Sequence, residues 1–258
     1  MGDVLVVACG GAAANIVDDY LENFDPDHLM FDDVALISRG KATATWQEVV
    51  KKVKGYRVVV PFAVLGGETG TDMIKDVIML ARDNRCKVVS VFGIPMAFEE
   101  IRRDRALKNL SGLVALSDVS LVLDMQKFVD LNLGINQNRD WVQFLKMSDR
   151  MVMFAVMSLV RYMDGPFFTT FTNSLYAFVI HNEMFPVDAA MKGWESLWFD
   201  RNPQLDDAVI MVGASTSSAE MDDIRDNIVR KYGTLPQIVK RSDPDDSKVI
   251  VLKAVRSF

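Results

Sequence analysis

The sequence has few of the residues that build metal sites or disulfide scaffolds. Its 258 residues include only two cysteines, Cys9 and Cys86, and two histidines, His28 and His181. No CxxC or HExxH pattern occurs, so the sequence does not predict a structural zinc site. The two cysteines lie far apart in apolar stretches. We expect them to be buried free thiols rather than a disulfide or a redox pair.

The chain also lacks an excess of basic residues and a hydrophobic run long enough to cross a membrane. Its 29 Lys and Arg face 35 Asp and Glu, a net charge of -6, which argues against nucleic-acid binding. The longest apolar stretch, Met151–Met163, has 13 residues and contains Arg161, whereas a membrane span needs about 20. Asp3, close to the start, argues against a signal peptide. We therefore expect a cytoplasmic protein with no direct membrane insertion.

Half of the residues in the chain are hydrophobic (50%). In the first half of the chain, apolar runs alternate with helical patterns. This alternation is typical of an α/β domain with a Rossmann-like parallel sheet. The expected strands are Val4–Cys9, Val34–Ile37, Arg57–Val64, Lys87–Phe92 and Ser120–Leu123. The expected helices are Ala12–Asn23, Thr45–Lys54, Thr71–Arg82 and Phe98–Leu116.

The second half of the chain predicts a different organisation. Residues 138–164 predict one long helix that is apolar on most sides, and such a helix is buried between layers. A smaller α+β unit follows, with helices over Val187–Trp198 and Ala219–Tyr232. Its expected strands are Ala208–Val212, Ile238–Arg241 and Val249–Val255, the last two as antiparallel neighbours. The expected parts are an α/β domain at 1–137, a central helix at 138–164 and an α+β C-terminal domain at 165–258.

Two glycine-containing turns follow buried strands and precede helices, at the edge of the sheet where α/β domains bind ligands. They are residues 9–15 (CGGAAAN) and 65–72 (LGGETGTD). Such turns offer backbone N–H groups and helix N-termini to phosphate. A tight strand–helix turn is the alternative for each alone, but two together favour a phosphate-bearing ligand. Replacing Gly66 or Gly70 with Val should then abolish binding and leave the fold intact.

Two common nucleotide motifs are absent from the sequence. The P-loop pattern GxxxxGK[ST] does not occur. A dinucleotide-binding fold has GxGxxG after its first strand and an acidic residue at the end of its second strand. This chain has GGAAAN after the first expected strand and Ser38-Arg39 after the second. Ser-Arg would suit an NADP-type enzyme, but that alternative leaves the second glycine turn without a role.

The combination of motifs resembles the FtsZ/tubulin superfamily. Residues 10–17 (GGAAANIV) stand where the family has GGGGxNAV, and residues 66–72 (GGETGTD) match the tubulin signature GGGTGTG at five of seven positions. Residues 91–103 stand where FtsZ has VxxxPFxFEGxxR. The resemblance covers most of the chain. It implies a guanine-nucleotide-binding protein that assembles into filaments or oligomers, with GTP or GDP as its ligand and Mg²⁺ as a further candidate.

The resemblance also assigns candidate site residues. The two glycine turns would hold the phosphates, Glu99 and Arg103 of the third loop the ribose, and the central helix the base. Leu145 takes the place of a stacking aromatic, and Asp149 is the guanine candidate, with an ordinary surface acid as the alternative. The candidate nucleotide-binding residues are Gly10, Gly11, Ala12, Asn15, Gly66, Gly67, Thr69, Gly70, Thr71, Pro95, Glu99, Arg103, Leu145 and Asp149.

Several positions depart from the family's pattern. Met125 stands where the family has a base-binding Asn, a further glycine-rich γ-phosphate loop is missing, and Glu68 and Asp72 replace glycines of the signature. A carboxylate beside phosphate costs ~1 kcal/mol or more unless Mg²⁺ intervenes. Gly165–Tyr176, in the place of the catalytic loop, contains no Asp or Glu. We therefore assign no catalytic residue and expect weak or absent GTP hydrolysis. The alternative is a scaffold that keeps the fold without binding nucleotide.

Overall fold

The computed structural model describes most of the first half of the chain and parts of the second. The described residues are 2–23, 32–37, 44–126, 146, 149, 152, 153, 156, 175–181, 187, 188, 190, 191, 205–240 and 249–255. The chain divides into two compact units, Met1–Asn173 and Ser174–Phe258. The boundaries expected at 137 and 164 lie outside the described residues and stay a prediction.

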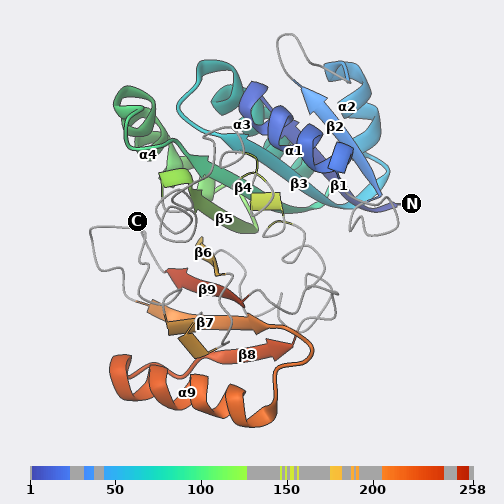
Figure 1. Ribbon diagram of the computed structural model, residues 1–258. Coiled ribbons are helices and arrows are strands. Elements are labelled where there is room, and N and C mark those ends of the chain that lie inside the picture. The colour runs from blue at the N-terminus through green and yellow to red at the C-terminus, as the bar shows by residue number, and fades with distance from the viewer. Residues whose placement is uncertain are drawn as a thin grey trace. The chain divides into compact units, whose positions relative to one another are not determined.

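The first unit alternates strands and helices, as the apolar runs predict (Figure 1). The strands are β1 (Gly2–Cys9), β2 (Asp33–Ile37), β3 (Tyr56–Val64), β4 (Lys87–Ile94) and β5 (Val119–Asp124). The helices are α1 (Gly11–Asn23), α2 (Trp46–Val53), α3 (Glu68–Asp83) and α4 (Glu100–Val114). Strand order is β2-β1-β3-β4-β5, with every pairing parallel. The predicted Rossmann-like α/β domain is confirmed.

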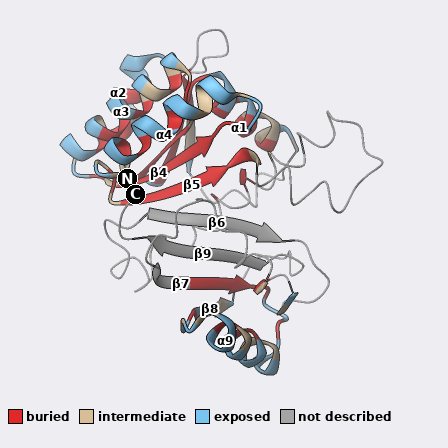
Figure 2. Cartoon of the chain, turned by 90° about the vertical axis from the view of Figure 1, so that its left-hand side faces the viewer, coloured by how far each residue is buried: buried red, intermediate tan, exposed pale blue. Residues whose placement is uncertain are grey.

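The strands of this sheet are buried on both faces. Residues 5–8 of β1 and residues 58–63 of β3 are buried throughout, because helices cover both sides. With this strand order, right-handed crossovers place α1 on one face and α2, α3 and α4 on the other, as Figure 2 shows. The carboxyl ends of β1 and β3 are adjacent, so the turns that follow them lie next to each other.

The predicted thiol state is confirmed. Cys9 and Cys86 are both buried free cysteines. Burial raises the pKa of each thiol, and at Cys9 the charge of Asp76 adds to this effect. Both therefore behave as inert core side chains.

The second unit contains β6 (Leu175–His181), β7 (Leu205–Val212), α9 (Ser218–Tyr232), β8 (Gln237–Lys240) and β9 (Val249–Val255). Its strand order is β6-β9-β7-β8. A small core joins the sheet to α9, whose Ile224 and Ile228 pack with Ile210 and Val212 of β7. A capping box between Ser217 and Glu220 begins α9, and Gly233 ends it in the left-handed conformation.

Two predictions for this unit are wrong. The last two strands are not neighbours, because β7–α9–β8 forms a crossover with β7 and β8 parallel, and β9 then pairs antiparallel with β7 on its other side. The strand β6 is not among the expected strands, and its first two residues, Leu175 and Tyr176, end the stretch interpreted as a loop. Among the residues that the structure describes, no helix is both long and apolar enough to span a membrane.

Candidate functional site

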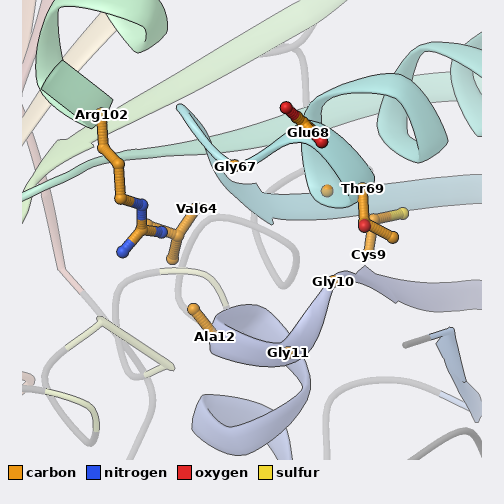
Figure 3. A pocket seen from close by; sticks show the side chains of 10 residues that line it. Cys9, Gly10, Gly11, Ala12, Val64, Gly67, Glu68, Thr69 and Arg102 are labelled. Carbon is orange, nitrogen blue, oxygen red and sulfur yellow. The ribbon is translucent and has the colours of Figure 1, made fainter. Parts of the chain in front are cut away.

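The two glycine turns line one pocket of about 150 Å³ (Figure 3). Residues 9–12 reach it from the end of β1 and the start of α1, and residues 67–70 from the N-terminus of α3. Val64 of β3 and Arg102 of α4 complete the lining. The parallel pairing of β1 with β3 is what brings the two turns together.

Gly10 and Gly70 are glycines because the two turns pack backbone against backbone. Gly10 has a φ of +85°, and a Cβ built on it would lie 2.9 Å from the Cα of Gly70. A Cβ on Gly70 would lie 3.1 Å from the carbonyl oxygen of Cys9. The Gly10 N–H donates to the Ile37 carbonyl at 2.8 Å, which fixes the first turn to β2 as well.

Gly66 connects the second turn to α4. Its φ is also +85°, and a Cβ built there would lie 2.0 Å from the carbonyl oxygen of Arg102. The Gly66 N–H donates to the Thr71 hydroxyl at 3.2 Å. Valine at Gly66 would therefore disturb the chain itself, and the expectation that Gly66→Val leaves the fold intact is wrong. For Gly70→Val that expectation stays a prediction.

Gly11 and Gly67 differ from these packed glycines. A Cβ on Gly11 would meet nothing within 4 Å, and one on Gly67 would meet only the Arg102 Nη2, at 4.0 Å. Gly11 is the first residue of α1, and Gly67 is the N-cap of α3, where no side chain accepts a hydrogen bond from the helix N-terminus. The first N–H groups of a helix have no intrahelical partner and favour anions. Two helix N-termini thus present such groups at one pocket.

The pocket lining carries one charge of each sign. The Glu68 carboxylate lies in the first turn of α3. Arg102 reaches from the start of α4 toward Val64, on the side of the pocket where Ala12 lies, as Figure 3 shows. The carboxylate lowers the attraction for an anion, and the guanidinium raises it.

Comparison with known proteins gives a consistent result. No protein-family model matches the chain. The curated cell division protein FtsZ 2 of Methanocaldococcus jannaschii is 27% identical over 165 residues, which span 52% of this chain and 43% of that relative. An FtsZ dimer structure from the same organism aligns with 99% of this chain and 88% of its own, with a TM-score of 0.70 and 18% identity.

Two CetZ structures also align over nearly the whole chain. CetZ from Methanosaeta thermophila covers 100% of this chain and 88% of its own with a TM-score of 0.67 and 15% identity. CetZ1 from Haloferax volcanii, a GDP-bound monomer, covers 98% of this chain and 93% of its own with a TM-score of 0.66 and 12% identity. The chain has an FtsZ/tubulin-like fold.

In this FtsZ-like chain, the third-loop residues assigned to the ribose lie elsewhere than in the pocket lining. Arg103 donates from Nη1 to the Pro95 carbonyl at 2.7 Å and to Asp124 Oδ1 at 2.8 Å. Its Nη2 donates to Asp124 Oδ2 at 2.6 Å. Glu99 forms an ion pair with Arg102. The Pro95, Glu99 and Arg103 assignments stay predictions.

The remaining candidates lie on α1, on α3 and in the expected central helix of this FtsZ-like chain. Asn15 is exposed on α1, and the Thr71 hydroxyl already accepts from Gly66. Leu145 lies outside the described residues, whereas Asp149 is helical and partly buried. Burial raises the pKa of Asp149 to about 6, and the negative charge of Asp19 is the second, smaller cause. Lys146 Nζ lies 3.7 Å from Asp19 Oδ1, so this helical segment lies beside α1.

Six of the ten lining residues are among the candidates predicted from the sequence, and Arg102 is the main omission. A signal for it was present, because Glu99 and Arg102 are three residues apart at a helix start and so share a face. Among the described residues, no group of three or more His, Cys, Asp or Glu could hold a metal ion.

Proposed function

We propose that this FtsZ-like chain binds a guanine nucleotide, GTP or GDP, with its phosphates in the pocket between the β1–α1 and β3–α3 turns. The observation that carries this proposal is that two helix N-termini meet at one pocket where Gly11 and Gly67 leave open space. N–H groups arranged in this way bind phosphate oxygens. The GDP in CetZ1 of Haloferax volcanii, whose fold this chain shares, supports the choice of ligand.

The size of the pocket supports a phosphate subsite. Whole small-molecule sites occupy roughly 300–1,000 Å³, whereas this pocket has about 150 Å³. The ribose and base would therefore extend beyond it. Asp149, beside α1, is the candidate for the base, because an ionised carboxylate can accept from both N–H donors of guanine and finds no such pair on adenine.

We also infer that the chain associates with itself and hydrolyses GTP weakly or not at all. The M. jannaschii FtsZ with the same fold was solved as a dimer, which supports self-association. The apolar Gly165–Tyr176, which carries no carboxylate, would then serve a contact rather than activate water. A central helix at 138–164 between the two domains belongs to the same proposal.

A melting-temperature series with GDP, GTP and ATP tests nucleotide binding. A ligand at 100 times its Kd stabilises the folded chain by ~2.7 kcal/mol, so GDP and GTP should each raise the melting temperature by several degrees, and ATP by less. Asp149→Ala should remove the difference between guanine and adenine nucleotides. An equal response to GDP and ATP in the unmodified chain would contradict the role of Asp149.

A non-binding scaffold is the second candidate, and Glu68 is the observation that favours it. Its carboxylate lines the pocket where the family signature has glycine, and it would repel phosphate. No shift of melting temperature with any nucleotide would support the scaffold and contradict nucleotide binding. If Glu68 only weakens binding, Glu68→Gln should increase the shift caused by GDP.

A further inference from the structure

Two consecutive arginines at the start of α4 have different surroundings. Arg102 lines the pocket, whereas Arg103 contacts Asp124 and the Pro95 carbonyl. Consecutive residues on a helix point about 100° apart, so the two side chains cannot serve the same site. The family motif places its ligand-binding arginine at the position of Arg103, and the structure places a guanidinium at the pocket from the position before it.

Arg103 is fully engaged within the protein. Its two terminal nitrogens bind both oxygens of Asp124, whose side chain is only 3% exposed. The Gln126 N–H also donates to Asp124 Oδ1, at 3.0 Å, and Gln126 Oε1 accepts from the Ala97 N–H at 3.0 Å. Arg103 therefore ties the third loop to the end of β5. Turning it toward a ligand would leave a buried carboxylate unpaired, which is costly.

Arg102 lies where its guanidinium can reach an anion in the pocket. Its carbonyl packs against Gly66, and its Nη2 lies 4.0 Å from the site of a Cβ on Gly67, the N-cap of α3. Its side chain is 42% exposed, and its ion pair with Glu99 holds the guanidinium at the rim. Among the described residues that line the pocket, Arg102 is the one cation. A guanidinium binds phosphate through two parallel N–H groups.

We propose that Arg102, not Arg103, is the arginine that binds the ligand's phosphate groups. The inference rests on the proposed function, since it assigns a residue to that same pocket. Because Glu99 already restrains the side chain, Arg102 loses little rotamer entropy when phosphate binds. Glu68, on the other side of the α3 N-terminus, opposes this charge, so the affinity for phosphate depends strongly on Arg102.

Titration calorimetry with three probes separates the phosphate contact from the base contact. The probes are GDP, inorganic pyrophosphate and guanosine. Each is titrated into the unmodified chain and into the variants Arg102→Gln, Arg102→Lys and Arg105→Gln. Arg105 is exposed on the same helix and outside the pocket lining, so it is the matched control. Loss of one charge-assisted pair should weaken GDP and pyrophosphate about ten- to hundredfold in Arg102→Gln. Guanosine should bind as before, and lysine should restore part of the loss.

The outcomes distinguish the two levels of the proposal. If GDP and pyrophosphate bind Arg102→Gln and Arg105→Gln equally well, the role of Arg102 is overturned while nucleotide binding stands. If guanosine weakens as much as GDP, Arg102 does not act on phosphate. If the unmodified chain binds none of the probes, the proposed function fails, and this inference fails with it. A melting curve of each variant shows that it is folded, which is expected because a surface ion pair contributes little to stability.

Discussion

At the scale of single residues, Asp124 and Arg103 form a buried ion pair in the first unit, where the Asp124 side chain is only 3% exposed. Asp124 accepts two hydrogen bonds from Arg103 and one from the backbone of Gln126. Pairing at both oxygens offsets the cost of taking the carboxylate out of water. The pair therefore fixes the third loop against β5, and with it the start of α4 that carries Arg102.

We predict that Arg103→Gln lowers the free energy of unfolding by about 3 kcal/mol, because removing one partner of a buried pair leaves the other charge uncompensated. Urea unfolding measures this change. Arg105→Gln, an exposed change on the same helix, should lie within about 0.5 kcal/mol of the unmodified chain. Adding Asp124→Asn to Arg103→Gln should recover part of the loss. Equal stability of the two arginine variants would contradict a structural role for Arg103.

Asp149 makes stability depend on pH. Its pKa rises from 3.8 to about 6 in the folded chain, so the folded state binds the proton more tightly than the unfolded state does. The contribution of this group to stability therefore falls as pH rises from about 4 to about 6, and it stays low above that. We predict that Asp149→Asn removes this fall and is more stable than the parent at pH 7 by about 1–2 kcal/mol. Unfolding at pH 4, 6 and 7 tests this, and identical pH profiles would contradict it.

At the scale of elements, the site depends on two strand–helix turns that touch. Gly10 and Gly70 meet at backbone distance, and Gly66 meets the first turn of α4. These glycines position the helix N-termini, whereas Gly11 and Gly67 leave the space in front of them open. The signature glycines thus have two separate roles, and substitutions should separate them.

We predict that Gly66→Ala lowers the free energy of unfolding by about 3 kcal/mol or more. An alanine with positive φ costs roughly 1–2 kcal/mol, and the 2.0 Å approach of its Cβ to the Arg102 carbonyl requires the backbone to move as well. Gly112→Ala is the control, because Gly112 lies within α4 with open space around it. It should stabilise the chain by up to about 1 kcal/mol. A Gly66→Ala variant as stable as the parent would show that the turn is placed wrongly.

Periodicity predicted the elements well and their pairing less well. The apolar runs of β1, β3 and β4 could be predicted because a parallel strand buried on both faces has no polar alternation. The order of β7, β8 and β9 could not, since a run such as Val249–Val255 does not specify its partner. A crossover through α9 makes β7 and β8 parallel, which moves β9 to the other side of β7. The glycine motifs predicted the two turns of the site. Which of Arg102 and Arg103 faces the pocket depends on how α4 is rotated about its axis, and alignment to a family motif does not specify that rotation.

At the scale of the whole molecule, the chain has an FtsZ-like fold, and its residues 165–176 contain no Asp or Glu. We predict GTP turnover at least ~10²-fold below that of an active FtsZ, because removing one group that stabilises the transition state typically costs 10²–10³ in rate. Turnover should also not rise with protein concentration, since Gly165–Tyr176 brings no carboxylate to a neighbouring subunit. Phosphate release across a concentration series measures both. A rate per chain that increases with concentration would contradict this prediction.

The central claim, that the two turns form a phosphate site, is tested most directly by titrating GDP into the unmodified chain and Gly67→Val. Gly67 has an extended backbone (φ -89°, ψ 145°) that valine adopts readily, and its added side chain would enter the pocket rather than the core. Gly112→Val, exposed on α4, is the matched control. We predict that the unmodified chain and Gly112→Val bind GDP alike. Gly67→Val should stay folded, because valine in place of glycine at an N-cap costs only about 1 kcal/mol, and should lose GDP binding at least tenfold. Equal GDP affinity in all three, or no binding by the unmodified chain, would contradict it.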